Sequence, residues 1–495
     1  MQTLHTPQEA ASWLAGRVRG ALRSDSRQVH AGDGFVAWPG AATDGRQHVA
    51  SALAGGAMAC LVEAEGLDAF DFGVAQDTAI AAYPGLKAAT GPIAAAYYEQ
   101  PSERLDVIAI TGTNGKTSTA WWLAQALSQA RTSGCGVIGT LGVGRPPQVE
   151  YTGLTTPDPV LLQAQLRRFA DEGLSACAME ASSIGIVERR LDGTRIAVAV
   201  FTNFSRDHLD YHGTLQAYWT AKASLFAWPR LRAAVVNIDD EKGEGLAQSL
   251  AHHALDLWTV SCHREDARLR ALDITYGEAG LRLTVVEGAQ RELLQTQMIG
   301  HYNAANLLGV IGAMRAVGVS LADAVRACAS LLPVPGRMER LHRPGHPLVA
   351  VDYAHTPDAL DKALGALRPL AQQRGGRLWC VFGCGGDRDT SKRPLMAAVA
   401  ESLADRVVVT SDNPRREKPQ SIIGQILLGL SHRNAVQVEI DRARAIASTV
   451  QAAAPADVIL LAGKGHEDHQ EVDGVRTPFD DRVHARLALD RRAAA

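Results

Sequence analysis

The chain has 495 residues, enough for about three domains, and its 46% hydrophobic and 21% charged residues are typical of a globular protein. Its 50 Lys and Arg against 53 Asp and Glu give a net charge of −3, which argues against a dedicated nucleic-acid-binding protein. Seven scattered cysteines without a CxxC pair argue against a disulfide framework or zinc site and favour a reducing cytoplasm. The start lacks a signal-peptide pattern, and no apolar run approaches the roughly 20 residues of a membrane span.

Residues 1–100 form the first predicted unit, a small α/β domain. Two short apolar strands and an intervening helix are predicted at residues 34–38, 59–62 and 49–54. The polar segment Ser24–Arg27 and a glycine-rich turn at 40–46 suit an anionic ligand such as a diphosphate, although the pattern alone is more typical of ordinary turns. Residues 84–98 are predicted to be helical, with a kink or split at Gly91–Pro92.

Residues 101–335 form the second predicted unit, which opens with a phosphate-binding pattern. An apolar strand at 105–110 leads into the glycine loop Gly112–Ser118, and a helix follows at 120–127. Glycines let backbone N–H groups approach phosphate oxygens, while Lys116 can reach the β- and γ-phosphates and the Thr117 hydroxyl can hold Mg²⁺. The loop is shorter than the generic G-x-x-x-x-G-K-[ST] pattern, whose first glycine would fall at Ile110.

Alternating strands and helices continue through this unit. Strands are predicted at 176–180, 197–201 and 233–237, and helices at 159–172, 215–225 and 302–317. Such alternation predicts a mostly parallel sheet with both faces covered, of the P-loop type. Residues 258–297 alternate in polarity and indicate an antiparallel flap.

Residues 336–495 form the third unit, which begins after the breaker cluster Leu332–Arg337. The same alternation predicts a Rossmann-like α/β domain, with strands at 348–352, 378–382, 406–410 and 458–462. In open α/β sheets, ligands bind outside the carboxyl ends of the strands, and those ends carry the polar residues here.

Polar side chains at strand ends predict a Mg²⁺ site beside the glycine loop. Glu180 ends one strand and His208 follows the next, so both face the same edge as Thr117. His208 taken alone is more typical of a structural histidine, and its spacing from His212 does not indicate zinc because residues 210–213 are predicted to form a turn. Lys222 lies on a predicted helix, where a lysine is usually solvated.

Several motifs occur in one order across roughly the last three-quarters of the chain: GTNGKTS, MEASS, NFSRDHLDYHG, YWTAKASLF, GHYNAANLL, PGRMER, VDYAHTPDAL and FGCGGDRDTSKRP. Together they resemble the Mur ligases of peptidoglycan synthesis. The resemblance implies an ATP- and Mg²⁺-dependent enzyme that joins meso-2,6-diaminopimelate to the D-Glu γ-carboxylate of UDP-N-acetylmuramoyl-L-alanyl-D-glutamate through an acyl phosphate. It also implies a cytoplasmic enzyme, which we expect to be monomeric, with closing domains that exclude water.

The resemblance assigns roles residue by residue. The ATP site comprises Gly112, Thr113, Asn114, Gly115, Lys116, Thr117, Ser118, Asn303, Asn306, Arg337 and Asp352. The UDP-sugar site comprises Ser24, Ser26, Ala41, Ala42, Thr43, Thr155, Thr156, Ser182, Glu188 and Arg190. The catalytic and metal-binding residues are Lys116, Thr117, Glu180, His208 and Lys222, the last as a carbamate made from CO₂.

The amino-acid site is implied by Asp412-Asn413-Pro414-Arg415, which is similar to the diaminopimelate motif of this family. A guanidinium binds the distal carboxylate bidentately, whereas lysine would leave Arg415 unpaired. By the same resemblance Asp412 and Glu467 hold an ammonium, Arg388 holds a carboxylate and Gly463 joins the pocket. His355 is a candidate base for the incoming amine.

Two residues depart from the family pattern. Glu188 stands where glutamine is familiar, and Ile184 where histidine often occurs. An acid beside an anionic substrate is unfavourable unless it is protonated or paired, so we expect a partner for Glu188 such as Arg189 or Arg190. Two enzymatic alternatives remain, a lysine-adding ligase and a folylpolyglutamate-type ligase, and a third is a nucleotide-binding regulatory module without turnover.

Overall fold

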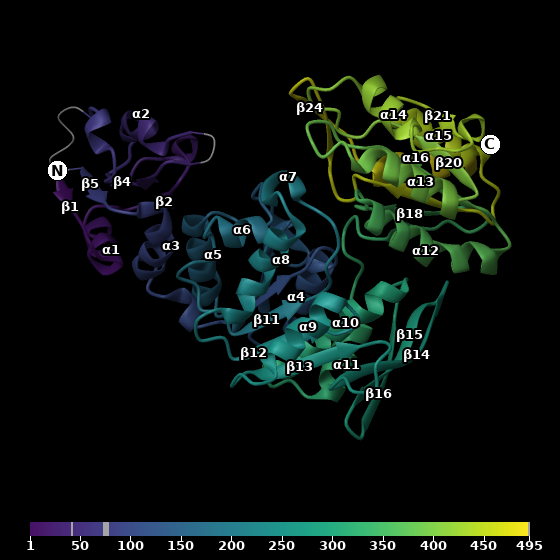
Figure 1. The fold of residues 1–495 in the computed structure, drawn as a ribbon, viewed down its shortest axis with the longest axis horizontal. Helices are drawn as coiled ribbons and strands as arrows, with labels where there is room; N and C mark the ends of the chain where they lie inside the picture. Colours follow the sequence, from purple (N-terminus) through teal and green to yellow (C-terminus); the bar gives the residue numbers. More distant parts are fainter. Residues whose placement is uncertain (41–42, 73–78, 494–495) are drawn as a thin grey trace.

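The computed structural model describes residues 1–40, 43–72 and 79–493, which form three units built on separate sheets (Figure 1). The second unit lies between the first and the third, in chain order. Each sheet is covered on both faces by apolar clusters, which confirms the predicted α/β class. Among these residues, no helix has the length and apolarity needed to cross a bilayer.

The first unit has a parallel sheet in the order β1-β5-β4-β3-β2. Its strands are β1 (Gln2–Thr3), β2 (Leu22–Arg23), β3 (Gly34–Ala37), β4 (Ala59–Glu63) and β5 (Ile80–Tyr83), and its helices are α1 (Pro7–Ala15), α2 (Val49–Ala54) and α3 (Leu86–Tyr97).

Helix α3 continues through Pro92, so the predicted split at Gly91–Pro92 is wrong. A Cβ atom on Gly91 would lie 2.1 Å from the carbonyl oxygen of Asp192 in the second unit. The glycine therefore lets the helix backbone pack directly on the second unit. Ile93 and Ala94 are buried as well. This burial stabilises α3 at a proline that would otherwise interrupt the helix.

The second unit has an eleven-stranded sheet in the order β16-β15-β14-β13-β12-β11-β6-β10-β7-β8-β9. Its parallel centre comprises β6 (Asp106–Thr111), β7 (Cys135–Gly139), β10 (Ala176–Glu180), β11 (Val198–Phe201), β12 (Ala233–Asn237) and β13 (Asp256–Ser261). One antiparallel edge comprises β8 (Gly142–Arg145) and β9 (Gln148–Glu150), and the other, predicted as a flap, comprises β14 (Leu269–Gly277), β15 (Gly280–Glu287) and β16 (Gln290–Thr296).

Helices cover both faces of this sheet. Those on one face are α4 (Lys116–Ala130), α10 (His301–Ala316) and α11 (Leu321–Ala329), and those on the other are α5 (Pro159–Asp171) and α9 (Glu241–Leu250). Three shorter helices follow strand ends: α6 (Ser183–Val187), α7 (Leu209–His212) and α8 (Leu215–Ala223). The predicted turn at 210–213 is therefore largely a single helical turn.

The third unit has the sheet order β17-β18-β22-β19-β20-β21, parallel except for β17. Its strands are β17 (Glu339–Leu341), β18 (Leu348–Asp352), β19 (Leu378–Phe382), β20 (Arg406–Val409), β21 (Gln437–Val438) and β22 (Val458–Ala462). Helices α12 (Pro357–Arg374), α13 (Lys392–Leu403) and α14 (Pro419–Leu427) cover one face, and α15 (Arg442–Ala452) and α16 (Asp481–Ala493) the other. A separate hairpin comprises β23 (His469–Val472) and β24 (Val475–Pro478).

Candidate active site

A cavity of about 1810 Å³ lies between the second and third units and gathers most of the predicted site residues. Its lining includes Thr113, Asn114, Gly115, Lys116, Thr117, Ser118, Thr155, Thr156, Glu180, Ser182, Arg190, His208, Lys222, Asn303, Asn306, Arg337, Asp352, His355, Arg388, Asp412, Asn413, Arg415, Gly463 and Glu467. Parallel strands of two sheets end here, so residues from distant parts of the chain share one space.

The glycine loop between β6 and α4 has the conformation that its sequence demands. Gly112 and Gly115 have φ values of 146° and 85°. A Cβ on Gly115 would lie 2.4 Å from Oδ1 of Asn306, so the glycine also permits α10 to approach the loop. Lys116 folds back and donates from Nζ to the carbonyl oxygens of Gly112 and Thr113, both at 2.9 Å. Burial lowers the pKa of Lys116.

Oxygen ligands collect beside this loop. The Thr117 hydroxyl donates to Oε2 of Glu180 at 3.0 Å, and the Thr140 N–H donates to Oε1 at 2.7 Å. Arg337 of the third unit reaches the same Thr117 hydroxyl at 3.3 Å. The hydroxyl oxygens of Thr117 and Thr140 and the carboxylate of Glu180 are oxygen atoms, the ligand type that Mg²⁺ prefers.

His208 lies at the entrance of α7 with a φ of 51°, and its Nε2 is 3.5 Å from Oδ2 of Asp207. Burial lowers the pKa of His208, and the neighbouring Lys116 and Lys222 act in the same direction, against Asp207. A neutral imidazole is the form that can ligate a metal.

Lys222 is buried, with 1% of its surface exposed, which contradicts the solvated helix face expected from the residue pattern. Helix α8 packs against α6 and α7, and this packing turns Lys222 towards the glycine loop. Its Nζ donates to the Gly112 carbonyl oxygen at 2.6 Å and lies 4.4 Å from the Tyr218 ring centre. Burial and the like charge of Lys116 hold the pKa of Lys222 well below its usual range.

The residues predicted to contact the UDP-sugar are divided between two places. Thr156 donates to the Glu180 carbonyl oxygen at 2.8 Å and accepts from the Ser182 N–H at 3.1 Å, while Thr155 and Thr140 hydroxyls are 3.0 Å apart. The remaining residues, outside the described cavity lining, are Ser24, Ser26, Thr43 and Glu188; Ala41 and Ala42 are outside the described residues.

The Ser24–Arg27 segment forms the ordinary turn that the pattern favoured. Asp25 caps a 3₁₀ turn by accepting from the Arg27 N–H at 3.0 Å, and it also pairs with the Arg27 guanidinium at 2.7 Å. These contacts account for Asp25 but leave the two flanking serines half-buried.

Glu188 is paired, but not with the neighbours we expected. Lys87 of α3 donates to its Oε2 at 2.7 Å, and the Tyr211 hydroxyl donates to Oε1. The Lys87 hydrogen bond lowers the pKa of Glu188. Arg189 instead faces Asp192 at 3.7 Å, and Arg190 donates to the Thr156 carbonyl oxygen at 3.0 Å. The pair therefore joins the first and second units.

Two of the residues predicted to bind the nucleotide, Asn303 and Asn306, contact each other. Asn303 donates to the Ile299 carbonyl oxygen at 2.7 Å, and Asn306 donates to Oδ1 of Asn303 at 3.2 Å. Asp352 accepts from the Met338 N–H at 2.6 Å, and burial raises the pKa of its carboxyl.

His355 lines the same cavity, with Nδ1 2.8 Å from the Tyr353 carbonyl oxygen. A carbonyl accepts, so Nδ1 carries the proton and Nε2 keeps its lone pair. Burial lowers the pKa of His355 to about 4, so the ring is neutral at physiological pH.

The amino-acid motif forms a loop after β20 in which Asp412 and Asn413 are buried. Asn413 donates from Nδ2 to Oε2 of Glu467 at 2.8 Å. Arg415 has a φ of 51° and donates to the Gly386 carbonyl oxygen at 2.7 Å. Arg388 is exposed on the cavity wall, whereas Pro414 faces a second recess behind the loop.

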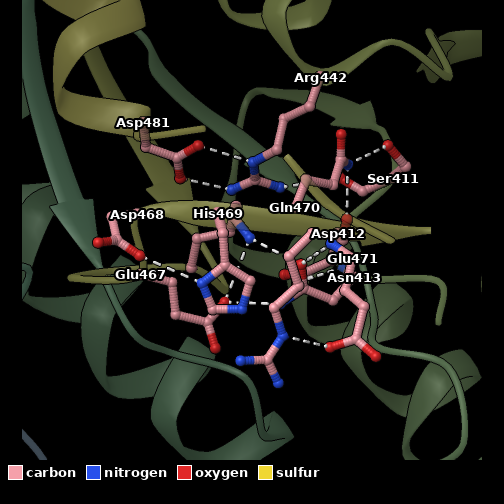
Figure 2. Close-up of polar contacts among 12 residues, drawn as sticks. Ser411, Asp412, Asn413, Arg442, Glu467, Asp468, His469, Gln470, Glu471 and Asp481 are labelled. Atoms are coloured by element: carbon pink, nitrogen blue, oxygen red, sulfur yellow. Dashed lines mark hydrogen bonds and ion pairs between the residues drawn. The ribbon is translucent and has the colours of Figure 1, made fainter. Parts of the chain in front are cut away.

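A supporting layer behind this loop was not predicted (Figure 2). The Arg442 guanidinium pairs with Asp481 at 2.6 Å, with both side chains fully buried, and donates to the carbonyl oxygens of Ser411 and Ala462. Gln470 of the hairpin donates to the Ser411 hydroxyl at 3.0 Å and to the Asp412 carbonyl oxygen at 2.6 Å. Nothing in the local sequence marks these residues, because they lie at helix starts and on a polar hairpin.

Lys464 was also missed, although the sequence contains a signal for it. It lies between Gly463 and Gly465 directly after the apolar strand β22, the same strand–glycine–lysine order as in the phosphate loop. Its ammonium is fully buried and lies 3.2 Å from Oε2 of Glu467.

Comparison with known proteins places these features in a family. Residues 110–314 match the Mur ligase middle domain, and residues 336–465 match the Mur ligase, glutamate ligase domain. A protein of Acidovorax sp. (strain JS42), UDP-N-acetylmuramoyl-L-alanyl-D-glutamate–2,6-diaminopimelate ligase, is 61% identical, and the match covers 99% of each chain.

Solved structures agree with this result. A structure of a ligase with that same name is 35% identical, has a TM-score of 0.66 and is matched over 96% of this chain and 95% of its own. The MurF ligase of Thermotoga maritima, solved in complex with ADP, shares the fold at 19% identity and a TM-score of 0.64, over 97% of this chain and 99% of its own.

Proposed function

The chain belongs to the Mur ligase family, and on this premise we propose that it is an ATP-dependent ligase that joins meso-2,6-diaminopimelate to UDP-N-acetylmuramoyl-L-alanyl-D-glutamate in peptidoglycan precursor synthesis. One observation carries the proposal. A single cavity contains a phosphate loop around Lys116 and, across it, an acidic pair flanked by Arg388 and Arg415. An amide-bond-forming ligase needs a nucleotide phosphate, a carboxylate and an amine in one such space.

The amino-acid end of the cavity fits an amino acid whose side chain ends in both an ammonium and a carboxylate. Diaminopimelate carries an ammonium and a carboxylate there. Asp412 and Glu467 suit the ammonium, while Asn413 and the guanidinium of Arg415 suit the carboxylate. Arg388, Pro414 and Gly463 complete this proposed site. Lysine lacks the distal carboxylate and would leave Arg415 unpaired in the cavity.

The reaction proceeds in two steps. The γ-carboxylate of D-Glu attacks the γ-phosphorus of ATP, forming an acyl phosphate and releasing ADP. The amine then attacks the acyl carbon, and the tetrahedral intermediate collapses with loss of phosphate and a proton. Lys116 neutralises phosphate charge, and Ser118, Asn303, Asn306, Arg337 and Asp352 hold the nucleotide, so that the protein contributes mainly positioning and charge compensation.

Mg²⁺ fits the oxygen-rich group beside the phosphate loop. Thr117, Glu180 and His208 would hold it, together with Lys222 as a carbamate, and the ion supplies charge neutralisation on the phosphates. Burial holds the pKa of Lys222 well below its usual range and so favours the unprotonated amine, which can add to CO₂, forming an N–C bond and releasing one proton. The product is an anion with two oxygens, which matches the ligand type of the site.

The attacking amine must be deprotonated, and His355 is proposed to accept a hydrogen bond from it. Its neutral ring presents Nε2 as an acceptor, since Nδ1 is used by the Tyr353 carbonyl. Its low pKa makes it a weak base, so it serves as a hydrogen-bond acceptor that orients the amine rather than as a strong proton acceptor.

The nucleotide-sugar is assigned to the first unit and its border with the second. Ser24, Ser26, Ala41, Ala42 and Thr43 form one part of this proposed site; Thr155, Thr156, Ser182 and Arg190 form the other. Glu188 supports it indirectly, through Lys87, because a paired carboxylate does not repel an anionic ligand. The three proposed domains, residues 1–100, 101–335 and 336–495, close around the reactants. The enzyme acts as a monomer in the cytoplasm.

The test is phosphate release from ATP with the UDP-muramoyl dipeptide and either diaminopimelate or lysine. We expect phosphate release with diaminopimelate. With lysine, kcat/KM should be at least about 10²-fold lower, because lysine cannot form the charged bidentate pair with Arg415. Faster release with lysine would identify the lysine-adding alternative. Turnover with a folate substrate in place of the dipeptide would identify a folylpolyglutamate-type ligase, and no turnover with any acceptor a regulatory module.

A further inference from the structure

The buried ammonium of Lys464 has a defined position inside the proposed amino-acid site. Its Nζ donates to Oδ1 of Asn413 at 3.0 Å and to Oε2 of Glu467 at 3.2 Å, and its side chain has no exposed surface. A charge is buried in proteins only where partners compensate its desolvation. The compensating partners here are Asn413 and Glu467, which belong to the proposed diaminopimelate site. Lys464 therefore forms part of that site.

These contacts determine which way the Asn413 amide faces. Oδ1 of Asn413 accepts from Lys464 and also from the Glu471 N–H at 3.0 Å. Its Nδ2 donates to Glu467 at 2.8 Å. A flipped amide would place NH₂ against an ammonium and a second N–H donor and its oxygen against the Glu467 carboxylate, so all three contacts would become unfavourable. The amide therefore presents its N–H groups, and one of them remains available to a carboxylate.

Lys464 also sets the charge of the acidic pair. When both carboxyl groups are ionised, Asp412 and Glu467 contribute two negative charges and Lys464 one positive charge, so the three together carry −1. That residual charge matches the single ammonium at the far end of diaminopimelate. The Arg442–Asp481 pair behind the loop adds no net charge of its own.

We propose that Lys464 is a positioning residue of the amino-acid site. Its ammonium fixes the Asn413 amide as a hydrogen-bond donor and leaves a net charge of −1 on the group formed by Asp412, Glu467 and Lys464. The inference rests on the proposed function, because it concerns the selection of the same amino acid. Lys464 acts through Asn413, Asp412 and Glu467 and does not itself contact the reacting atoms.

The surrounding charges agree with this role. Burial raises the pKa of Asp412, but Lys464 and Arg442 outweigh it and the pKa is lowered, with His355 acting in the same direction. Burial and the Asp412 charge raise the pKa of Glu467, and Lys464 opposes them. Among the described residues, Tyr353 and Arg442 also interact electrostatically with Glu467. Without the ammonium, both carboxyl groups would take up protons at higher pH.

Two substitutions separate the two parts of the role. Lys464→Met has a similar unbranched shape but lacks both donor and charge, whereas Lys464→Gln lacks the charge and keeps an N–H donor on a side chain that is one bond shorter. The exposed Lys418→Met, in the same unit, is the matched control. Each variant is assayed as the full chain for KM and kcat with all three substrates and for the pH dependence of kcat/KM.

We expect Lys464→Met to raise the KM for diaminopimelate by about 10-fold or more, the value of one charged hydrogen bond, and to change the KM for ATP and for the dipeptide by less than about twofold. The acid limb of kcat/KM for diaminopimelate should move to higher pH in both variants. Lys464→Gln should show the same shift of the acid limb but a smaller rise in the KM for diaminopimelate. If the methionine variant does not fold, the glutamine variant carries the test through its pH profile.

Trapping the acyl phosphate with borohydride, in the absence of any amino acid, separates this inference from the proposed function. A protein that forms no acyl phosphate from ATP and the dipeptide would contradict the function itself. A protein that forms it, but whose variants keep the wild-type KM and acid limb for diaminopimelate, would overturn the role of Lys464. Equal losses with all three substrates and an unmoved limb would reduce Lys464 to a structural residue.

Discussion

Asn114 of the phosphate loop donates a hydrogen bond from Nδ2 to Oδ2 of Asp358, 2.7 Å away, in the first turn of α12. Ser205, which follows β11, donates to the same oxygen at 3.0 Å. One carboxylate of the third unit therefore holds two loops at the nucleotide end of the second unit. Because the cavity lies between these units, this contact couples their approach to the shape of the phosphate loop.

Removing this carboxylate should loosen closure. Asp358→Ala deletes two hydrogen bonds between units, each worth about 1 kcal/mol, so the balance between closed and open forms should shift by about 10-fold or more. We expect a higher KM for ATP and a larger radius of gyration by small-angle X-ray scattering. Asp361→Ala, an exposed position on the same helix, is the control. An unchanged KM and radius would mean that the contact does not contribute to closure.

The buried Arg442–Asp481 pair should be essential to the third unit. Asp481→Ala leaves a fully buried guanidinium without its carboxylate, which costs about 3–5 kcal/mol. The measurement is denaturant unfolding followed by fluorescence. The exposed pair of Arg444 and Asp441 offers a comparison, since Asp441→Ala also removes a helix cap and should cost about 1–2 kcal/mol. Similar losses for both variants would contradict the prediction.

Lys222 should be required for turnover but not for folding. Lys222→Ala removes a proposed ligand of the metal site, so kcat should fall by about 10²-fold or more. A short carboxylate such as acetate should restore part of the activity, because it can supply the lost oxygens in the space that the lysine leaves. Lys242→Ala, on α9, is the control. Unaltered activity in the Lys222 variant would exclude the carbamate role.

Acid stability should depend on Glu417. Arg393, which is fully buried, donates to both oxygens of this carboxylate at 2.8 and 2.9 Å and lowers its pKa to about 2. A lowered carboxyl pKa stabilises the folded state above the unfolded value near 4.5, and this stability is lost as the pH falls towards 2.

Glu417→Gln should therefore remove about 1–2 kcal/mol at pH 6, a value reduced for the partly exposed side chain, and much less at pH 2.5. Unfolding at a series of pH values measures the difference, with Asp361→Asn as the control. A constant difference across this range would show that the ion pair is not linked to protonation.

Local patterns in the sequence determined the elements and the phosphate loop. Strand β6 and the glycines at 112 and 115 are recognisable because burial and positive φ restrict which residues are allowed there. The motif order determined the family for the same reason, since each motif lies at a strand end where chemistry constrains several adjacent residues.

Only the tertiary structure decided which charges face which. Lys222 has an ordinary helical context, and its burial results from the packing of α8 on α6 and α7. Glu188 was expected to pair with a neighbour in sequence, but a lysine 101 positions away is its partner. Lys464, Arg442 and Asp481 act through contacts between segments up to about 50 residues apart. Electrostatic partners depend on distance and burial in space, and the order of residues along the chain fixes neither.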